Sequence, residues 1–367
     1  MIPINLPEIG EEEIEAVVEV MKKGPLTNAL GAGPKVTQFE KNFAAFAGVK
    51  HAVAVNTGTA ALHSAIVAAG VKQGDEVILP SFTFVATAEA VVMAGGKPVF
   101  ADIDPDTYNI APAEIKRNLT KETKAIVPVD LYGFSGDAKP IREIAAEHDL
   151  MVVEDAAQAH GATYQGKPAG TFADAACWSL YASKNMTTGE GGVVTTDSDE
   201  VDETLRLLRT HGEKAKYASL MLGYNYRMSE IQAAIGVVQL AKLGSFVAKR
   251  RANAQRLNEI LAESDMLQLP KETKDRKHSW YLYTIRLKNG DRAERDKILE
   301  GLRQKGIGAV AYYVHPVHMM PYYRETFGER KLPETEEAAQ QVLSLPVHPG
   351  VTAKEVDYIG ETLLDLL

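Results

Sequence analysis

The sequence predicts an α/β fold, with a large domain built on a mostly parallel seven-stranded sheet between helices and a smaller α+β domain at the carboxyl-terminal end. Three observations lead to this prediction. The chain has 367 residues, which is room for about two domains at roughly 150 residues each. From residue 51 short apolar runs alternate with longer amphipathic stretches, as in strands joined by helices. Near residue 229 a long helical pattern replaces this alternation.

Seven apolar runs are predicted to form the strands of the large sheet. Several are apolar on successive residues, which is typical of strands buried on both faces. They span residues 51–55, 76–79, 97–101, 124–129, 150–154, 175–180 and 192–196. The stretches between the first five strands are long enough for right-handed crossover helices. We expect these helices at residues 58–69, 83–94, 112–119 and 137–148.

The long helix is predicted to begin after Ser229, because Ser229 and Gln232 have the spacing of a capping box and apolar residues follow at helical spacing. It runs into the charged stretch 248–256, where we expect a large domain of residues 1–247 to meet a small domain of residues 248–367. The small domain is predicted to contain a strand, a helix and a second strand, at residues 280–286, 293–305 and 308–314. The first thirty residues are expected to be shared by both domains.

Charge and cysteine content exclude several classes of protein. Lys and Arg number 40 against 49 Asp and Glu, and the net charge of −9 argues against general binding to nucleic acid or anionic membranes. The one cysteine, Cys177, cannot form an intrachain disulfide, a thiolate metal cage or a redox pair. The acidic amino terminus does not resemble a secretory signal, and no apolar run is expected to span a bilayer. We therefore expect a cytoplasmic location.

The motif Asn-Thr-Gly-Thr-Ala-Ala-Leu at residues 56–62 follows a predicted strand and opens a predicted helix. Gly58 allows close approach of the backbone, and the unpaired amides of a first helical turn suit a phosphate group. The alternative is a strand-to-helix turn that needs glycine only for its geometry. Both readings stay open for this motif taken alone.

Glu154 and Asp155 end a buried strand, at the edge where ligands bind in open α/β sheets. A buried carboxylate needs a cation or hydrogen-bond donors, and a protonated heterocyclic nitrogen would serve. The alternative for Asp155 is a helix N-cap.

Lys184 lies between an apolar strand and a glycine-rich turn, with the Ser179 hydroxyl five residues earlier. Its amine could be desolvated there and act as a nucleophile, and the alternative is an ordinary surface lysine. Together these residues describe a pyridoxal phosphate (PLP) site, which needs a lysine, an acid for the pyridine nitrogen and a phosphate anchor.

A series of motifs extends this interpretation along nearly the whole chain. In order they read NTGTAALH, PSFTFVAT, EDAAQAHGATYQGKPAG, SKNMTTGEGG, GYNYRM and SLPVHPGVT. In this combination the chain resembles the DegT/DnrJ/EryC1/StrS family of sugar aminotransferases, which have the fold type I architecture of aspartate aminotransferase. One departure from the family is Ala182-Ser183, where relatives usually carry Pro-Thr before the lysine.

The resemblance implies a role for each matching residue around the cofactor ring. Lys184 would bind PLP as an aldimine, Asp155 would face the pyridine nitrogen, and Gln158 would lie near the phenolic oxygen. Phe84 matches the aromatic residue on the ring face, and Phe82 is the alternative.

The resemblance also implies how the phosphate is held. Thr59 and Ala60, next to Gly58, match the phosphate anchors, and Ser179 would add its hydroxyl. Asn225 is similar to a residue that reaches the phosphate from a neighbouring subunit. The family therefore implies a homodimer with shared sites.

For the reaction, the family implies transfer of an amino group from L-glutamate to a nucleotide-linked keto sugar, most often a 4-keto-6-deoxyhexose. Tyr313, His318 and Arg227 are the candidate substrate contacts. Some family members have replaced the lysine by histidine and become dehydratases, whereas this chain keeps Lys184. A cyclitol acceptor, or a regulatory protein that keeps the fold without catalysis, are the alternatives within this fold.

Two further alternatives rest on short motifs. A metal site made of His315, His318 and His348 fits no familiar zinc spacing, and we expect no metal. A dehydrogenase is disfavoured because the glycines at 31 and 33 do not follow a strand and lack a third glycine.

Overall fold

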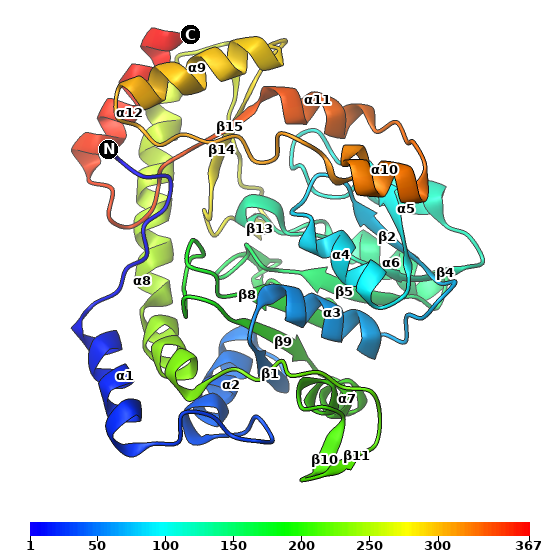
Figure 1. Cartoon of the computed structure of the whole chain (residues 1–367). Coiled ribbons are helices and arrows are strands. Elements are labelled where there is room, and N and C mark those ends of the chain that lie inside the picture. The colour runs from blue at the N-terminus through cyan, green and yellow to red at the C-terminus, as the bar shows by residue number, and fades with distance from the viewer.

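Seven strands form a large sheet through the middle of the computed structural model, which describes all 367 residues (Figure 1). In spatial order they are β1 (His51–Val55), β9 (Gly192–Thr196), β8 (Ala175–Ser179), β5 (Met151–Asp155), β4 (Thr123–Ile126), β2 (Glu76–Pro80) and β3 (Lys97–Ala101). Strand β9 is antiparallel to both of its neighbours, and the other adjacent pairs are parallel. The predicted mostly parallel, seven-stranded sheet is confirmed.

Two strands end earlier than predicted, β8 by one residue and β4 by three. Strand β4 ends at Ile126 rather than at residue 129, and beyond it only Val129 pairs with Asp155, as an isolated bridge. The Asp130 backbone N–H then donates to the Asp155 carbonyl (3.0 Å), so the chain still follows β5 to its end.

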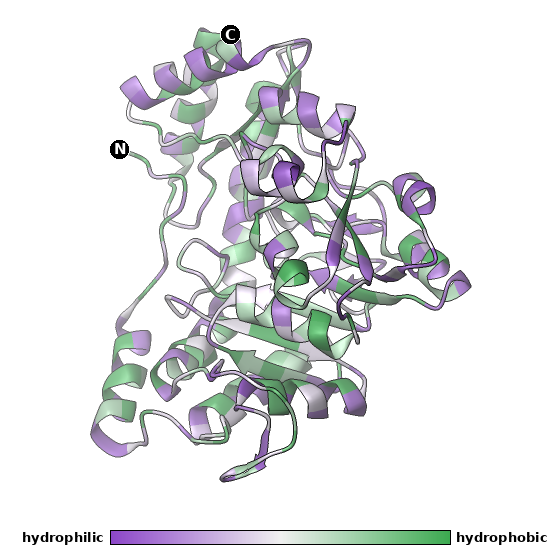
Figure 2. Ribbon diagram, turned by 45° about the vertical axis from the view of Figure 1, so that its right-hand side comes forward, coloured by the Kyte–Doolittle hydropathy of each residue, from purple (hydrophilic) through white to green (hydrophobic).

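Helices cover both faces of the sheet. Successive strand residues point to opposite sides, so a strand that is apolar on successive residues has two apolar faces to bury. In β1, Val53 and Val55 belong to the core under one set of helices, and Ala52 and Ala54 to the core under another. The first set consists of α3 (Gly58–Ala68), α4 (Ala86–Met93) and α7 (Asp199–Arg209). The second set consists of α2 (Pro34–Ala47), α5 (Pro112–Asn118), α6 (Ala138–Glu147) and α8 (Glu230–Leu261). The four predicted crossover helices are confirmed. Figure 2 shows that the central strands are mostly hydrophobic.

Helix α8 begins as the sequence predicts. The Gln232 backbone N–H donates to Ser229 Oγ (3.2 Å), and the Ser229 N–H donates to Gln232 Oε1 (2.9 Å), which completes the capping box. The helix is 32 residues long, so the domain boundary predicted at residues 247 and 248 falls inside it. One rigid element therefore runs through both parts of the chain, and the division into domains stays a prediction.

The expectation that no apolar run is long enough to span a bilayer is wrong for α8, which meets that criterion by length and composition. The helix packs against α1 (Glu11–Lys23), α2 and α12 (Ala353–Leu366). Its buried residues therefore belong to the core of the fold.

The carboxyl-terminal part is built on a small antiparallel sheet of β12 (Leu267–Gln268), β14 (Tyr283–Leu287) and β15 (Val342–Leu345). The predicted helix is confirmed as α9 (Arg292–Gln304). The strand predicted at 308–314 is wrong, because only Val310 pairs there, with Ser344. The remaining elements are α10 (Pro321–Phe327), α11 (Pro333–Gln341), the sheet of β13 (Arg276–Lys277), β6 (Thr163–Tyr164) and β7 (Lys167–Pro168), the hairpin β10 (Glu213–Ala215) and β11 (Ala218–Ser219), and two short 3₁₀ turns, Leu131–Gly133 and Val317–Met319.

The amino-terminal segment contacts the region of the small sheet and the first half of α8, and its sharing by two domains stays a prediction. Ile2 pairs with Ile307 near the small sheet, through hydrogen bonds of 2.8 Å on each side of Ile2. The chain then descends to α1, which packs on the first half of α8 (Figure 1).

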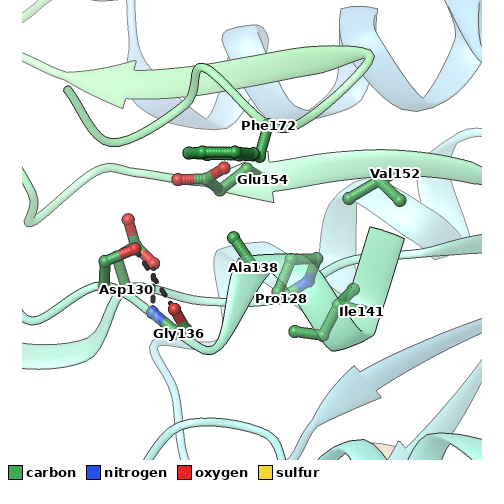
Figure 3. A pocket seen from close by; sticks show the side chains of 9 residues that line it. Pro128, Asp130, Gly136, Ala138, Ile141, Val152, Glu154 and Phe172 are labelled. Carbon is green, nitrogen blue, oxygen red and sulfur yellow. Dashed lines mark hydrogen bonds between the residues drawn. The ribbon is translucent and has the colours of Figure 1, made fainter. Parts of the chain in front are cut away.

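A pair of buried acidic side chains lies under the carboxyl edge of the sheet. Asp130 is 1% exposed and Glu154 is 5% exposed, and both line a small cavity beside Phe172 (Figure 3). Asp130 Oδ1 accepts the Gly136 N–H (2.8 Å), and Asp130 Oδ2 has no hydrogen-bond partner. Burial, and then the neighbouring Glu154, raises the pKa of Asp130 well above its usual range, and burial also raises the pKa of Glu154. The folded chain therefore favours a proton on this pair.

We predict that Asp130→Asn stabilises the fold at alkaline pH. Because the folded-state pKa of Asp130 is raised, its contribution to the free energy of unfolding is complete below about pH 4, where unfolded Asp titrates, and is lost as the pH rises. The neutral Asn amide avoids this loss and can donate to Glu154. Urea unfolding should show equal stability near pH 4 and a gain of about 1–3 kcal/mol at pH 8.

The exposed Asp265→Asn variant is the control for this experiment and should behave as the parent chain at both pH values. A variant Asp130→Asn that is less stable than the parent at pH 8 would show that the pair does not hold a proton.

Candidate active site

Asp155 ends strand β5 and is 5% exposed. Its Oδ2 accepts a hydrogen bond from Thr87 Oγ1 (2.7 Å), and its Oδ1 accepts one from the Ala157 N–H (3.1 Å). Burial raises the pKa of Asp155, and these two donors and the nearby Lys184 charge act in the opposite direction. No helix follows Asp155, so the N-cap alternative is wrong. The carboxyl group is fixed in place and needs a cation as partner.

Lys184 lies in the loop between β8 and β9 and is partly buried. Its Nζ lies 4.5 Å from the centroid of the Tyr281 ring, and its charge is near enough to favour the ionised form of Asp155. The surface-lysine alternative is therefore wrong. The structure brings together the predicted amine and the predicted acid.

The first turn of α3 provides free backbone donors. Thr57 caps the helix by accepting the Ala60 N–H (3.0 Å), so Ala60, a predicted phosphate anchor, has its amide engaged. The amides of Gly58 and Thr59 have no acceptor within the chain. An amide pair at a helix N-terminus suits an anion such as phosphate.

Close packing holds this helix end against the sheet. A Cβ on Gly58 would lie 2.8 Å from Ser179 Cβ, and a Cβ on Gly192 would lie 2.3 Å from the Thr57 carbonyl oxygen. Both glycines are needed for these contacts, so Gly58 serves the geometry of the turn, and its role at a phosphate stays a prediction. The Ser179 hydroxyl is thereby placed beside the first turn of α3.

Gln158 and Phe84 lie at the same edge. Gln158 Oε1 accepts the Tyr132 N–H (2.8 Å), and its Nε2 donates to Tyr313 Oη (3.3 Å). Phe84 is 56% exposed, with its ring centroid 6.3 Å from that of Tyr313. Phe82 is fully buried, so of the two aromatic candidates only Phe84 has a ring face free for a ligand.

Asn225 and Arg227 lie on a segment that pairs with the end of β1, where Val55 forms a bridge with Arg227 and the Asn56 N–H donates to the Tyr226 carbonyl (2.9 Å). Asn56 Nδ2 donates to the backbone carbonyl of Asn225 (3.3 Å). The Asn225 side chain is exposed and has no hydrogen-bond partner in its own chain. Arg227 contacts His211 (3.3 Å). No contact joins either side chain to Lys184.

The structure does not bring His318 to this group. The residue is buried, with Nδ1 2.7 Å from Ser81 Oγ and Nε2 3.3 Å from Glu336 Oε1, so both ring nitrogens are engaged. His348 hydrogen bonds with the Pro3 carbonyl (3.1 Å). The structure contains no cluster of three or more His, Cys, Asp or Glu side chains arranged for a metal ion.

The glycines considered for a dinucleotide site have another role. Gly33 caps α2, and the Glu230 carboxylate accepts the Lys35 N–H (2.7 Å) at this helix end. A Cβ on Gly33 would lie 2.0 Å from Glu230 Oε1. Because a side chain of the protein occupies this helix N-terminus, it is not free for a cofactor phosphate.

The sequence interpretation missed Thr87 and Tyr281, which contact Asp155 and Lys184. Thr87 follows Thr83 by one helical turn in the motif PSFTFVAT, and the two hydroxyls lie 3.1 Å apart. This spacing is a signal for an inward-facing polar pair. Nothing local in the sequence marks Tyr281, because it comes from the carboxyl-terminal part of the chain.

The site fits a phosphorylated aromatic ring that carries a protonated nitrogen. The free amides of Gly58 and Thr59 suit the phosphate, and the buried Asp155 carboxylate suits the ring cation. Lys184, whose charge acts on Asp155, supplies the amine. These are the three groups that PLP requires from a protein.

Comparisons with known proteins agree with this chemistry. A family model described as the DegT/DnrJ/EryC1/StrS aminotransferase family matches residues 7–364. The chain is 39% identical to the GDP-perosamine synthase of Caulobacter vibrioides over 369 residues, which covers 100% of this chain and 98% of the relative. It is also 39% identical to a pleiotropic regulatory protein of Geobacillus stearothermophilus, covering 99% and 97%.

A solved structure shows the same architecture. Helicobacter pylori PseC, an aminotransferase involved in the biosynthesis of pseudoaminic acid, superimposes with a TM-score of 0.94 and 31% identity, covering 100% of this chain and 98% of PseC. The large sheet and its helices are thus those of a fold type I transferase, and the family is PLP-dependent. The chain belongs to the DegT/DnrJ/EryC1/StrS aminotransferase family.

Proposed function

We propose that this aminotransferase moves an amino group from L-glutamate to a nucleotide-linked keto sugar, with PLP bound covalently to Lys184. The observation that carries the proposal is the placement of Lys184 beside the buried Asp155, at the edge where α3 offers free amides. A sugar acceptor is supported by the family and by the relative named GDP-perosamine synthase. A 4-keto-6-deoxyhexose is the acceptor that we propose.

PLP, when bound, supplies an electron sink that makes a proton on the substrate carbon removable. Asp155 would hold a negative charge against the ring nitrogen, and Thr87 and Ala157 keep that carboxylate in one orientation. The fixed carboxylate needs no reorganisation during the reaction, which is the main source of electrostatic catalysis.

Lys184 has two roles in this proposal. Its Nζ would hold the cofactor in the resting enzyme, and the freed amine would move a proton from the α-carbon of glutamate to the cofactor carbon to which Lys184 had been bonded. The Gly58 and Thr59 amides, which have no acceptor in the chain, and the Ser179 hydroxyl would bind the phosphate, and the exposed Phe84 would cover one ring face. Gln158 would lie near the phenolic oxygen.

For the acceptor, we propose Tyr313 and Arg227 as substrate contacts. Tyr313 hydrogen bonds with Gln158 and lies against Phe84, so its hydroxyl is next to the proposed cofactor position. Arg227 lies two residues after Asn225, and its positive charge suits a substrate phosphate. His318 is withdrawn from this set because both of its ring nitrogens are engaged.

We also propose a homodimer in which Asn225 completes the phosphate site of the partner. Apolar side chains are exposed on α1 and on the segment that leads to Asn225, where Leu220 is 65% and Leu222 is 75% exposed. Residues of this kind mark contact surfaces when they gather in one region. The exposed Asn225 side chain has no partner in its own chain.

The acceptor class is tested by titrating the pyridoxamine-loaded enzyme with keto substrates. We expect nucleotide-linked 4-keto-6-deoxyhexoses to restore the pyridoxal form, followed by absorbance, and the 3-keto isomers and an inosose to react at least about tenfold more slowly. Preferential reaction of the inosose would identify a cyclitol aminotransferase. Absence of reaction with every acceptor, together with no reaction with glutamate, would support a regulatory protein.

Replacing Asp155 by Asn tests the role of the acid. The change removes the charge that favours a protonated ring nitrogen and keeps the size of the side chain, so we expect turnover to fall by roughly 10³-fold or more with little change in thermal stability. The control is again Asp265→Asn. Turnover of Asp155→Asn within threefold of the parent would show that another acid faces the ring.

Mixing two variants, at a PLP concentration too low to load Asn225→Ala, tests whether the site is shared. Lys184→Ala loses the amine, and Asn225→Ala is expected to weaken cofactor binding about 10- to 100-fold. If Asn225 acts on the partner, a mixed dimer carries one site with both changes and one site with neither. Random exchange should then restore about a quarter of the parent activity. No restored activity in mixed dimers would place Asn225 in its own subunit's site.

A further inference from the structure

The segment that carries Tyr281 is held firmly at its backbone. Arg250 on α8 is 2% exposed, and its Nη1 donates to the carbonyls of Trp280 (3.3 Å) and Tyr281 (3.2 Å). On the other side, the Leu282 N–H donates to the Tyr132 carbonyl (3.1 Å). Helix α8 and a loop of the large sheet thus fix the backbone of Tyr281.

Ser279, two residues earlier, joins this segment to both sides of the site. Its Oγ donates to the carbonyl of Gly133 or Gln158, each 3.2 Å away, and its carbonyl accepts Asn185 Nδ2 (3.0 Å). A Cβ on Gly133 would lie 2.3 Å from Ser279 Oγ, so the crossing leaves no room for a side chain there. Because Asn185 follows Lys184 and Gln158 follows Asp155 by three residues, the segment is tied to the loops that present both reactive groups.

The Tyr281 ring itself is fixed beside Lys184. It is 7% exposed, its hydroxyl lies 3.0 Å from Ser183 Oγ, and Lys184 Nζ lies 4.5 Å from the ring centroid. An ammonium group within about 6 Å of an aromatic ring face is attracted by the ring quadrupole. Burial of the ring and the backbone contacts on both sides of Tyr281 hold it where the amine meets its face, and the hydroxyl additionally contacts the residue directly before the lysine.

We propose that Tyr281 is a positioning residue for Lys184, and that its ring face holds the lysine amine whenever that amine is not bonded to the cofactor. This inference rests on the proposed function, in which Lys184 alternates between a bonded and a free state. A free lysine has a flexible four-carbon stem and would otherwise sample many orientations. The ring holds the ammonium group that forms when the amine takes a proton, close to the carbon that receives this proton, and so lowers the entropic cost of the second part of the transfer.

A spectroscopic test reports the ring contact without activity. Lysine amines of the cofactor-free full-length protein and of its pyridoxamine form are labelled with ¹³C-methyl groups, which keep the positive charge. The Lys184 signal is identified by its absence in Lys184→Arg. We expect it upfield of the other lysine signals, because it lies over an aromatic ring.

Three variants separate the ring from its hydroxyl. Tyr281→Phe and Ser183→Ala keep the ring and should keep an upfield Lys184 signal, whereas Tyr281→Leu should move it to the position of solvent-exposed lysines. An unchanged signal in Tyr281→Leu would overturn the proposal. If Tyr281→Leu does not fold, an unshifted signal in the folded Tyr281→Phe protein or in the parent chain overturns it equally.

Kinetics give the second readout. Tyr281→Leu should lower kcat by roughly 2- to 30-fold, the range expected for one cation–π contact, with the KM for glutamate unchanged within about twofold. Tyr281→Phe should retain most of the parent kcat. The control Tyr358→Leu, on the surface of α12, should behave as the parent. A rise in KM with no change in kcat would show a role in binding substrate instead.

The two readouts also distinguish failure of this inference from failure of the proposed function. If the chain shows no activity with the proposed substrates but the Lys184 signal depends on the Tyr281 ring, the proposed function is wrong and the contact between Tyr281 and Lys184 stands. If activity is present and the signal does not depend on the ring, only the positioning role is wrong.

Discussion

A buried carboxylate at the end of a central strand is the constraint on which the rest of the structure depends. Asp155 lies where the sheet is covered on both faces, and its burial disfavours the charged form. Thr87 Oγ1 and the Ala157 N–H compensate part of this cost, and the remaining compensation comes from positive charge, to which Lys184 contributes. A carboxylate held this way has a strong preference for a cationic ligand, and a protonated pyridine ring is such a ligand.

The parallel sheet explains why the other groups lie near Asp155. Strands that run in one direction end at one edge, and the helix that follows β1 begins there with free amides. Gly58 and Gly192 allow α3 to approach β8 and β9 closely, so the free amides at the start of α3 lie beside Ser179. The carboxyl-terminal part then adds Tyr281 through a segment fixed by Arg250, so one long helix, α8, connects the small sheet to the reactive amine.

Much of this arrangement could be predicted from local sequence. The strands at 51–55, 97–101 and 192–196 have the predicted bounds, because short runs of apolar residues between turns define them. Asp155 and Lys184 could be named because each follows such a run. The strand predicted at 308–314 failed because pairing depends on a partner distant in the chain, and only Val310 finds one. For the same reason the sequence did not reveal that Ser81 and Glu336 engage His318, or that Tyr281 reaches Lys184.

Covalent binding of PLP to Lys184 can be checked by reduction with borohydride followed by peptide mass mapping. The reduced bond is permanent, so the labelled peptide reports the lysine that held the cofactor. We expect a single pyridoxyl label on the peptide that contains Lys184, and none in Lys184→Ala. A label on any other lysine, or no label after incubation with PLP, would rule out this role for Lys184.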